Sequence, residues 1–180
     1  VTITFLGGLG EIGRNCCAIE VDGDMVLVDF GLMFPGPDMP GIDLVLPDFS
    51  FITANADRLR AVVLTHGHED HVGGLPFLLR EVSVPLYGSR LTLGLARNRI
   101  EEAGLLGRTS FNAVADGETI TVGSMKIEFV PITHSVPSGN AIVFPTPQGL
   151  VMHSGDFKID NTPVDGRRSD LASIGHLSHT

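Results

Sequence analysis

The sequence has no apolar run long enough to cross a membrane, and it has only two cysteines. A membrane-spanning helix needs about 20 predominantly apolar residues. Cys16 and Cys17 are adjacent, and because a bridge between neighbours is strained, we expect buried, reduced thiols. Residues 1–6 lack the basic segment that opens a signal peptide. These absences predict a soluble, cytoplasmic protein that makes no contact with a membrane.

Basic residues are also scarce. The chain has 12 Lys and Arg against 21 Asp and Glu, a formal net charge of −9. A nucleic-acid surface normally carries an excess of positive charge, so a strongly basic binding face is excluded on this stretch. Nucleic acid as a partner is not excluded, because acidic metal ligands count as negative until cations bind. A chain of 180 residues that is 43% hydrophobic is typical of one folded domain with a core, or of part of a larger one.

Turn residues and hydrophobic periodicity predict many short strands and few helices. Residues 2–6, 16–21 and 25–30 read as strands, with Asp22-Gly23 as a hairpin turn, and residues 31–47 form a long loop. Further strands are predicted at 60–65, 84–87, 118–122, 125–131, 141–145 and 150–154, and helices at 75–81, 89–104 and 169–174. The pattern favours a mixed α/β architecture.

A glycine-rich segment after the first strand matches the pattern of a nucleotide-binding motif but not its structural context. Gly8-Leu9-Gly10-Glu11-Ile12-Gly13 fits G-x-G-x-x-G, and Asp29 lies 21 residues beyond Gly8. That motif requires a helix to begin at its last glycine, so that the helix N-terminus holds the pyrophosphate. Here the β-prone run 16–21 follows instead. We interpret the segment as a glycine-rich turn that lies beside some other site.

The strongest chemical signal is a cluster of histidines directly after a buried strand. His66, His68, Asp70 and His71 lie within six residues. The H-x-H spacing lets two imidazoles share one face of an extended backbone, while Asp70 and His71 turn away and reach a second cation. Imidazole and carboxylate are ligands of zinc and manganese. A polar loop with incidental histidines is the alternative, and the preceding strand and following Gly73-Gly74 favour the metal site.

The segment T-H-G-H-E-D-H-V-G-G resembles the H-x-H-x-D-H signature of the metallo-β-lactamase superfamily. Segments 7–15, 31–35, 41–49, 153–160 and 162–166 narrow the resemblance to the ribonuclease J family of the β-CASP group. The resemblance implies a metallo-β-lactamase αββα sandwich, an α/β (α+β) fold. It also implies that residues 1–180 are the N-terminal part of that domain, without the β-CASP insertion and the returning segment. We therefore expect an incomplete sandwich whose uncovered apolar face favours association.

The resemblance also implies a set of metal ligands. His134 matches the third histidine of the family, and Asp156 matches the aspartate that bridges two metals. The implied first metal is held by His66, His68 and His134, the second by Asp70 and His71, with Asp156 shared. The seventh ligand of the family lies beyond residue 180, and His176 or His179 is the candidate replacement. Nothing marks His153 as a ligand, so we expect it to pack beside its strand.

Three further residues are assigned supporting roles. Asp29 resembles a carboxylate that orients the histidine loop from outside the metal's own ligands. Ser135 and Ser138 are candidate contacts to a substrate phosphate, with ordinary turn residues as the alternative. The family often has an acidic residue where Ser138 stands, which leaves the substrate role of this position open.

The implied activity is hydrolysis of RNA phosphodiester bonds by a hydroxide held between two metals, with zinc expected and Mn²⁺ or Mg²⁺ as alternatives. Endonuclease and 5′-to-3′ exonuclease action both stay open. RNA is the implied substrate, and the full-length parent is expected to form a homo-oligomer or to join other ribonuclease subunits. Two alternatives remain: a superfamily hydrolase of a small ester, lactone or β-lactam, and a non-catalytic fragment. Segments 31–34 and 162–166 favour the ribonuclease over the small-molecule hydrolase.

Overall fold

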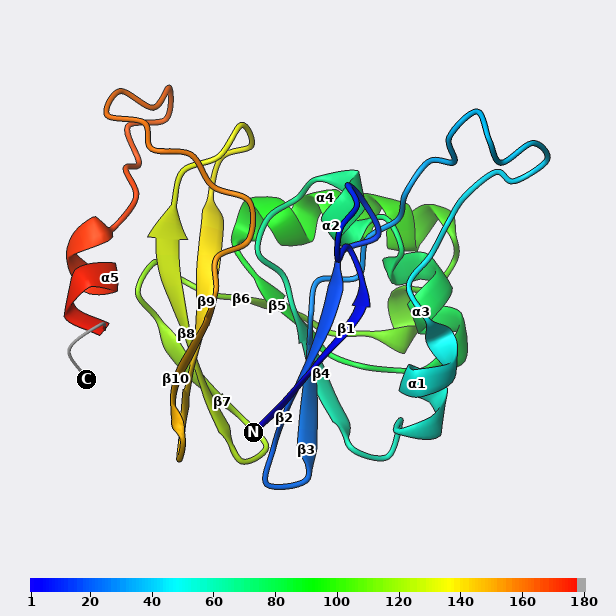
Figure 1. Ribbon diagram of the computed structural model, residues 1–180, viewed down its shortest axis with the longest axis horizontal. Coiled ribbons are helices and arrows are strands. Elements are labelled where there is room, and N and C mark those ends of the chain that lie inside the picture. The colour runs from blue at the N-terminus through cyan, green and yellow to red at the C-terminus, as the bar shows by residue number, and fades with distance from the viewer. Residues whose placement is uncertain (178–180) are drawn as a thin grey trace.

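The computed structural model describes residues 1–177, which fold into two facing β-sheets with helices outside them (Figure 1). The sheets have six and four strands. Helices α1 to α4 lie on the outer side of the six-stranded sheet, and α5 lies beside the four-stranded sheet (Figure 1). The layer order is the αββα arrangement that the sequence predicts, and strands of both sheets are present.

The six-stranded sheet follows the order of the chain from β1 to β6. Its strands are β1 (Thr2–Gly7), β2 (Cys16–Val21), β3 (Asp24–Val28), β4 (Leu59–Val63), β5 (Leu86–Gly88) and β6 (Phe111–Ala113). The first three strands pair antiparallel, and β3 to β6 pair parallel. Asp22 and Gly23 join β2 to β3 with φ of 48° and 87°, the two positive values that a type I′ hairpin turn requires.

The central strands are buried on both faces because a core lies against each face. In β4, Val62 packs in the core beneath the helices, whereas Ala61 and Val63 pack in the core between the sheets. This alternation follows from the two-residue period of a strand, and it explains why the strand reads as a continuous apolar run. The result is a rigid base for the loops that leave the carboxyl ends of β3 and β4.

The second sheet is antiparallel, in the order β10-β9-β8-β7. Its strands are β7 (Thr119–Val122), β8 (Met125–Ile132), β9 (Gly139–Thr146) and β10 (Gly149–His153). The four strands predicted for this stretch are present, and β7–β8 and β9–β10 pair as hairpins. Phe129 and Phe144 point from this sheet into the core between the sheets. At one end, the backbone N–H of Ser124 donates to Oδ2 of Asp24 at 2.7 Å, which ties the β7–β8 turn to the start of β3.

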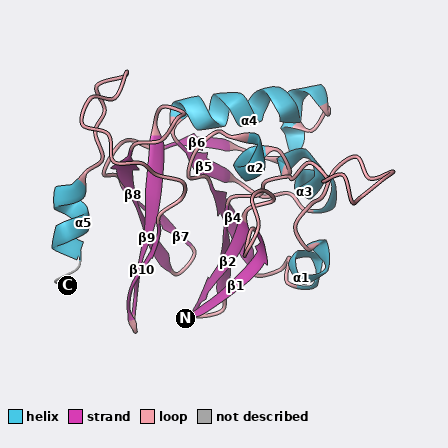
Figure 2. Ribbon diagram, turned by 45° about the horizontal axis from the view of Figure 1, so that its top comes forward, coloured by secondary structure: helices cyan, strands magenta, loops and turns pink. Residues whose placement is uncertain are grey.

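The helices are short except for one. They are α1 (Phe49–Ala54), α2 (Glu69–Val72), α3 (Leu75–Glu81), α4 (Arg90–Glu102) and α5 (Leu171–Leu177). Ser89 caps α4, since its hydroxyl accepts from the backbone N–H of Thr92 at 3.3 Å. Figure 2 shows α4 lying over β5 and β6. Helix α1 and strand β6 were not predicted because each is too short to show a period. None of the helices in residues 1–177 is both long and apolar enough to span a bilayer.

The outer face of the second sheet is apolar and only partly covered. Val130, Ile132, Ala141 and Val143 form a small buried cluster, against which Ile174 and Leu177 of α5 pack. Large side chains around it stay exposed, namely Met152, Phe157, Ile159 and Leu171. The predicted last helix, 169–174, begins at Leu171 and runs on to Leu177.

Candidate metal centre

The histidine cluster leaves the carboxyl end of β4, the edge at which sheets with parallel strands present their binding sites. His66 and His68 lie in the connecting loop, but residues 69–72 form the single turn of α2. Asp70 and His71 therefore lie on a helical turn, and not on the loop that the sequence predicts for the whole cluster. The helical rotation of about 100° per residue turns Glu69 outward, where its carboxylate accepts from Arg99 of α4 at 2.7 Å.

A buried carboxylate, Asp29, lies beneath this loop. It follows β3, is fully buried, and accepts three hydrogen bonds. The donors are the backbone N–H of Thr65 at 2.8 Å, the Thr65 hydroxyl at 2.7 Å and Nδ1 of His71 at 2.7 Å. Asp29 has a φ of 60°, a left-handed conformation in which Asp is enriched over most other residues. The geometry is that of the orienting carboxylate that the sequence suggests.

These hydrogen bonds decide which ring nitrogen His66 and His71 present. A carboxylate only accepts, so Nδ1 of His71 carries a hydrogen. The Thr65 hydroxyl donates its one hydrogen to Asp29, and it therefore accepts from Nδ1 of His66, 2.9 Å away. In their neutral forms, both rings consequently present an unprotonated Nε2 away from Asp29. A metal ligand must be unprotonated, and Nε2 meets that condition in both rings.

His68 presents its other ring nitrogen. Nδ1 of His68 lies 3.1 Å from Nε2 of His66, and its Nε2 lies 3.4 Å from the hydroxyl oxygen of Ser135. A hydrogen on Nε2, directed at Ser135, leaves Nδ1 for the centre. His134 follows β8, and its ring centroid lies 4.9 Å from those of both His66 and His68. Three imidazoles from two segments of the chain thus converge.

Asp156 reaches the same centre from the segment after β10. Gly155 has a φ of 58°, and a Cβ at Gly155 would lie 2.9 Å from Cβ of Thr65. Glycine therefore permits both the turn and the close approach to the histidine loop. Oδ1 of Asp156 lies 3.6 Å from Nε2 of His71, and Oδ2 lies 3.8 Å from Nε2 of His134. The Asp156 carboxylate therefore lies between the rings of His71 and His134.

Among the described residues, two groups of side chains have the geometry to hold a cation. Within each group the ligand atoms lie within 4.8 Å of one another, and the groups are His66, His68 and His134, and His66, His71 and Asp156. The donor set of imidazole nitrogen and carboxylate oxygen fits zinc or a similar divalent metal. Nε2 of His66 and Nδ1 of His68 lie 3.1 Å apart, so a cation held by both rings would replace a hydrogen bond between them.

Burial and charge set the protonation of these rings. Burial, reinforced by the nearby His71 ring, lowers the pKa of His66 to about 3. The pKa of His134 is also lowered, chiefly by burial. His71 differs, because burial disfavours its charged form but the Asp29 carboxylate outweighs burial, and the pKa of His71 is raised. His66 is therefore neutral at physiological pH.

Other residues singled out in the sequence lie outside these two groups. Asp70 is adjacent, with Oδ2 at 3.7 Å from Nε2 of His71. Nδ1 of His153 accepts the backbone N–H of the residue two positions on at 3.1 Å, so this histidine supports the turn before Asp156. His176 is exposed on α5. His179 lies outside the described residues.

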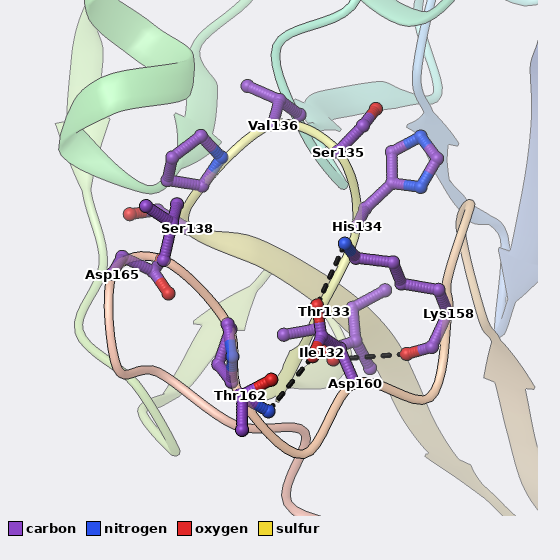
Figure 3. A pocket seen from close by; sticks show the side chains of 13 residues that line it. Ile132, Thr133, His134, Ser135, Val136, Ser138, Lys158, Asp160, Thr162 and Asp165 are labelled. Carbon is purple, nitrogen blue, oxygen red and sulfur yellow. Dashed lines mark hydrogen bonds and ion pairs between the residues drawn. The ribbon is translucent and has the colours of Figure 1, made fainter.

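A cavity of about 220 Å³ opens beside His134. Figure 3 shows Ser135 and Ser138 on the rim that continues from His134, and Lys158 and Asp160 on the facing segment. Nζ of Lys158 lies 2.9 Å from Oδ2 of Asp160. Ser138 has a φ of 61°, which is uncommon for a residue other than Gly, Asn or Asp. Both serines of the predicted phosphate contact therefore line one hollow next to the centre.

Thr65 is one residue of this site to which the sequence assigned no role. Its hydroxyl connects Asp29 to His66, and its backbone N–H also donates to Asp29. The signal was present, since Thr65 stands directly before the first histidine at the end of a buried strand. Threonine is common at the end of a strand because of its β propensity. Its role here becomes visible only from its hydrogen bonds to Asp29, which the sequence does not show.

Comparison with known proteins agrees with this geometry. A sequence model of the Metallo-beta-lactamase superfamily matches residues 9–176. The chain belongs to the metallo-beta-lactamase superfamily. Among solved structures, this superfamily member is similar to the metallo-beta-lactamase fold protein YhfI from Bacillus subtilis, with a TM-score of 0.61 and 18% identity over 89% of this chain and 64% of that one. Rm3 metallo-beta-lactamase gives a TM-score of 0.59 and 18% identity over 98% of this chain and 68% of that chain. At these identities the likeness shows the fold.

Curated relatives of higher identity confirm the resemblance to ribonuclease J. This superfamily member is 46% identical to Ribonuclease J of Synechocystis sp. over 94% of its own length and 27% of the relative. It is 44% identical to Ribonuclease J 1 of Streptococcus pyogenes, over 98% of this chain and 31% of the relative. It is 41% identical to Ribonuclease J2 of Bacillus subtilis, over 100% of this chain and 32% of the relative. The chain thus spans about a third or less of each of these relatives.

Proposed function

We propose that this chain is the catalytic N-terminal part of a metallo-β-lactamase domain in a ribonuclease J-like enzyme that hydrolyses RNA phosphodiester bonds. The observation that carries the proposal is the convergence of Asp156 with the histidines of the H-x-H-x-D-H loop. The identity of 41–46% to ribonuclease J proteins supports RNA as the substrate. We also propose that the enzyme acts in the cytoplasm.

The proposed ligand assignment differs from the two groups at the second site, where Asp70 takes the place of His66. His66, His68 and His134 would hold one divalent cation, and Asp70 and His71 would hold the other, with Asp156 shared between them. Zinc fits the donor set, and Mn²⁺ or Mg²⁺ are the alternatives. When bound, the cations supply a hydroxide nucleophile at neutral pH and neutralise charge on the phosphate oxygens.

The chain's own residues hold this arrangement and receive the substrate. Asp29 and Thr65 keep the ring nitrogens of His66 and His71 turned to the centre. Beside the centre, Ser135 and Ser138 offer hydroxyl donors in the cavity. We propose that these hydroxyls bind a phosphate of the RNA strand adjacent to the scissile bond. Such donors position the backbone without reading sequence.

The acidity of the chain does not oppose this function. The formal charge is −9, but salt screens surface charges beyond about 8–10 Å. At the centre, Asp29, Asp70 and Asp156 bring three negative charges against the four positive charges of two dications. Before a hydroxide is counted the centre would be net positive, and the cations themselves attract the phosphate oxygens locally despite the acidic surface.

The test is cleavage of a short 5′-phosphorylated RNA by the full-length protein with added Zn²⁺ or Mn²⁺. We expect Asp156→Ala to lower the rate by orders of magnitude, because a shared ligand is lost. Asp57→Ala, an exposed carboxylate before β4, is the matched control and should retain wild-type activity. Products from a labelled RNA distinguish endonuclease from 5′-to-3′ exonuclease action.

Two results would contradict the proposal. Equal rates for wild type and Asp156→Ala would remove the metal centre from the reaction. Hydrolysis of a lactone or β-lactam without RNA cleavage would identify a small-molecule hydrolase. If full-length protein binds metal but cleaves none of these substrates, the non-catalytic alternative holds.

We further propose that the full-length protein forms a homo-oligomer through the outer face of the second sheet, with other ribonuclease subunits as the alternative partner. The exposed side chains Phe157, Ile159 and Leu171 beside the buried cluster of that face support this, since contiguous exposed apolar surface marks interaction sites. Sedimentation of the wild type and of Phe157→Ser tests it. A lower mass for the variant supports association through this face, and identical masses contradict it.

A further inference from the structure

The glycine-rich turn at residues 7–15 ends in a side chain that enters the metal centre. Nδ2 of Asn15 lies 3.0 Å from the backbone oxygen of Asp70, 3.3 Å from Oδ2 of the same residue, and 3.1 Å from Nε2 of His71. Both contacted residues belong to the half of the centre assigned to the second cation. No contact of this kind was expected from the sequence, which left the turn without a function.

The orientation of the Asn15 amide follows from its neighbours. The carbonyl and the carboxylate of Asp70 only accept hydrogen bonds. Nδ1 of His71 donates to Asp29 at 2.7 Å, so in the neutral ring, which is the form that binds a metal, Nε2 is also an acceptor. The two hydrogens of the Asn15 NH₂ group then lie among three acceptors. One amide holds the Asp70 carboxylate and the His71 ring in a fixed relation.

The backbone of Asn15 is anchored as firmly as its side chain. Its N–H donates to the carbonyl of Asp70 at 3.0 Å, and its carbonyl accepts from the N–H of Gly31 at 2.9 Å. Asn15 thus lies between two loops, one after β3 and one containing the histidines. These backbone hydrogen bonds fix the position of the Asn15 side chain, because the backbone is bonded to Asp70, the same residue that the side chain contacts.

The glycines of this region leave the space that Asn15 and Asp70 occupy. A Cβ at Gly8, which has a φ of 80°, would lie 2.5 Å from Oδ1 of Asn15. A Cβ at Gly7 would lie 2.2 Å from the backbone oxygen of Arg14, and one at Gly31 would lie 1.6 Å from the backbone oxygen of Asp70. The glycines of the turn at residues 7–15 therefore leave the space in which Asn15 packs.

We infer that Asn15 is a positioning residue for the second cation, holding Asp70 and His71 in the arrangement that receives it. The inference rests on the proposed assignment of those two residues as ligands. Nε2 of His71 has one lone pair, so it either accepts from Asn15 or binds a cation. A cation at Nε2 would displace only that contact, because the other contacts of the Asn15 amide are to the backbone oxygen and the carboxylate of Asp70.

The test measures zinc affinity and not activity. Full-length protein is stripped with a chelator and titrated with Zn²⁺ by calorimetry, and bound metal is counted by elemental analysis. Loss of a partner that orients a ligand typically costs 10–100-fold in metal affinity. We expect Asn15→Ala to weaken the second Zn²⁺ by about 10-fold or more and to leave the first unchanged.

Asn15→Asp gives an independent readout. A carboxylate in place of the amide would face the carbonyl and carboxylate of Asp70, so we expect the metal-free variant to melt at a lower temperature. Zn²⁺ neutralises that repulsion, and its addition should raise the melting temperature of Asn15→Asp more than that of the wild type. Asn55→Ala is the control, because Nδ2 of Asn55 donates to the carbonyl of Phe51 at 2.7 Å, at the end of α1.

The outcomes separate this inference from the proposed function. If the wild type binds two Zn²⁺ and Asn15→Ala binds both with wild-type affinity, the positioning role is overturned while the metal centre stands. If Asn15→Ala weakens both cations equally, or Asn15→Asp gains no extra stabilisation from Zn²⁺, the residue supports the fold alone and the inference is overturned. If the wild type binds no Zn²⁺, the proposed ligand set fails first.

Discussion

Asp156 directs one carboxylate oxygen at each of two histidines from different parts of the chain. Oδ1 lies 3.6 Å from Nε2 of His71, and Oδ2 lies 3.8 Å from Nε2 of His134. Among the described residues, it is the only carboxylate that lies within 4.0 Å of both of those rings. Because the Asp156 side chain is about half exposed, it packs little against the core, and its main contacts are with the histidines of the centre.

Replacing Asp156 should therefore affect metal binding more than folding. We predict that Asp156→Ala loses affinity for both cations by more than the 10–100-fold typical of an outer partner. The melting temperature of the metal-free protein should change little, because the side chain is not buried. Zinc titration and thermal melting of the stripped protein check the two halves of the prediction. Retained affinity for one cation would mean that the carboxylate serves a single metal.

Asp29 has the opposite balance, since it is buried and accepts three hydrogen bonds. In Asp29→Asn, the new NH₂ group must face a donor of Thr65 or of His71. We predict a loss of about 3 kcal/mol in the free energy of unfolding, typical of breaking a buried charged pair. Urea denaturation measures it. Asp48→Asn is the matched control, because Asn caps helix α1 as well as Asp does, and an equal loss there would contradict the explanation.

Asp24 connects the two sheets and makes that connection sensitive to acid. The backbone N–H of Ser124, and then the Arg60 guanidinium, lower the pKa of the Asp24 carboxyl below its usual value. A carboxyl with a lower pKa in the folded state stabilises the fold above its unfolded pKa, and the contribution disappears as the pH falls through the folded pKa.

The variant Asp24→Asn should consequently melt below the wild type at neutral pH. The difference in melting temperature should shrink as the pH falls below about 4, where the wild-type carboxyl also becomes neutral. Melting curves at a series of pH values from neutral to acid measure this difference. A difference that stays constant over the whole range would show that the charge of Asp24 contributes nothing.

Two glycines should respond to alanine in opposite directions. A Cβ at Gly31 would lie 1.6 Å from the backbone oxygen of Asp70, whereas a Cβ at Gly94 of α4 meets nothing within 4 Å. We predict that Gly31→Ala destabilises by about 1–3 kcal/mol, as overpacking does, and weakens binding of the second cation. Gly94→Ala should stabilise by about 0.5–1 kcal/mol through helix propensity. Denaturant unfolding checks both, and a stable Gly31→Ala variant would refute the close approach.

Much of this fold follows from local patterns. The apolar run before His66 predicted a buried strand, and Asp22-Gly23 predicted the hairpin that joins β2 to β3. Strand periodicity and turn chemistry act over a few residues, so the sequence displays them directly. Helix α1 and strand β6 were not predicted, because six and three residues are too few to show a hydrophobic period. Asp70 and His71 fell on a helical turn that no residue pattern in the dense ligand cluster marks.

The chemistry of the proposed centre can be predicted from the sequence, since the kinds of ligand and their spacing in the histidine loop are local. How those ligands are held depends on contacts between distant parts of the chain. Thr65 lies 36 residues from Asp29, and Asn15 lies 55 residues from Asp70, so no short-range pattern connects either pair. Their contacts exist because parallel pairing of β3 with β4 brings two carboxyl ends together, and because glycines without a Cβ let a distant turn approach the histidine loop.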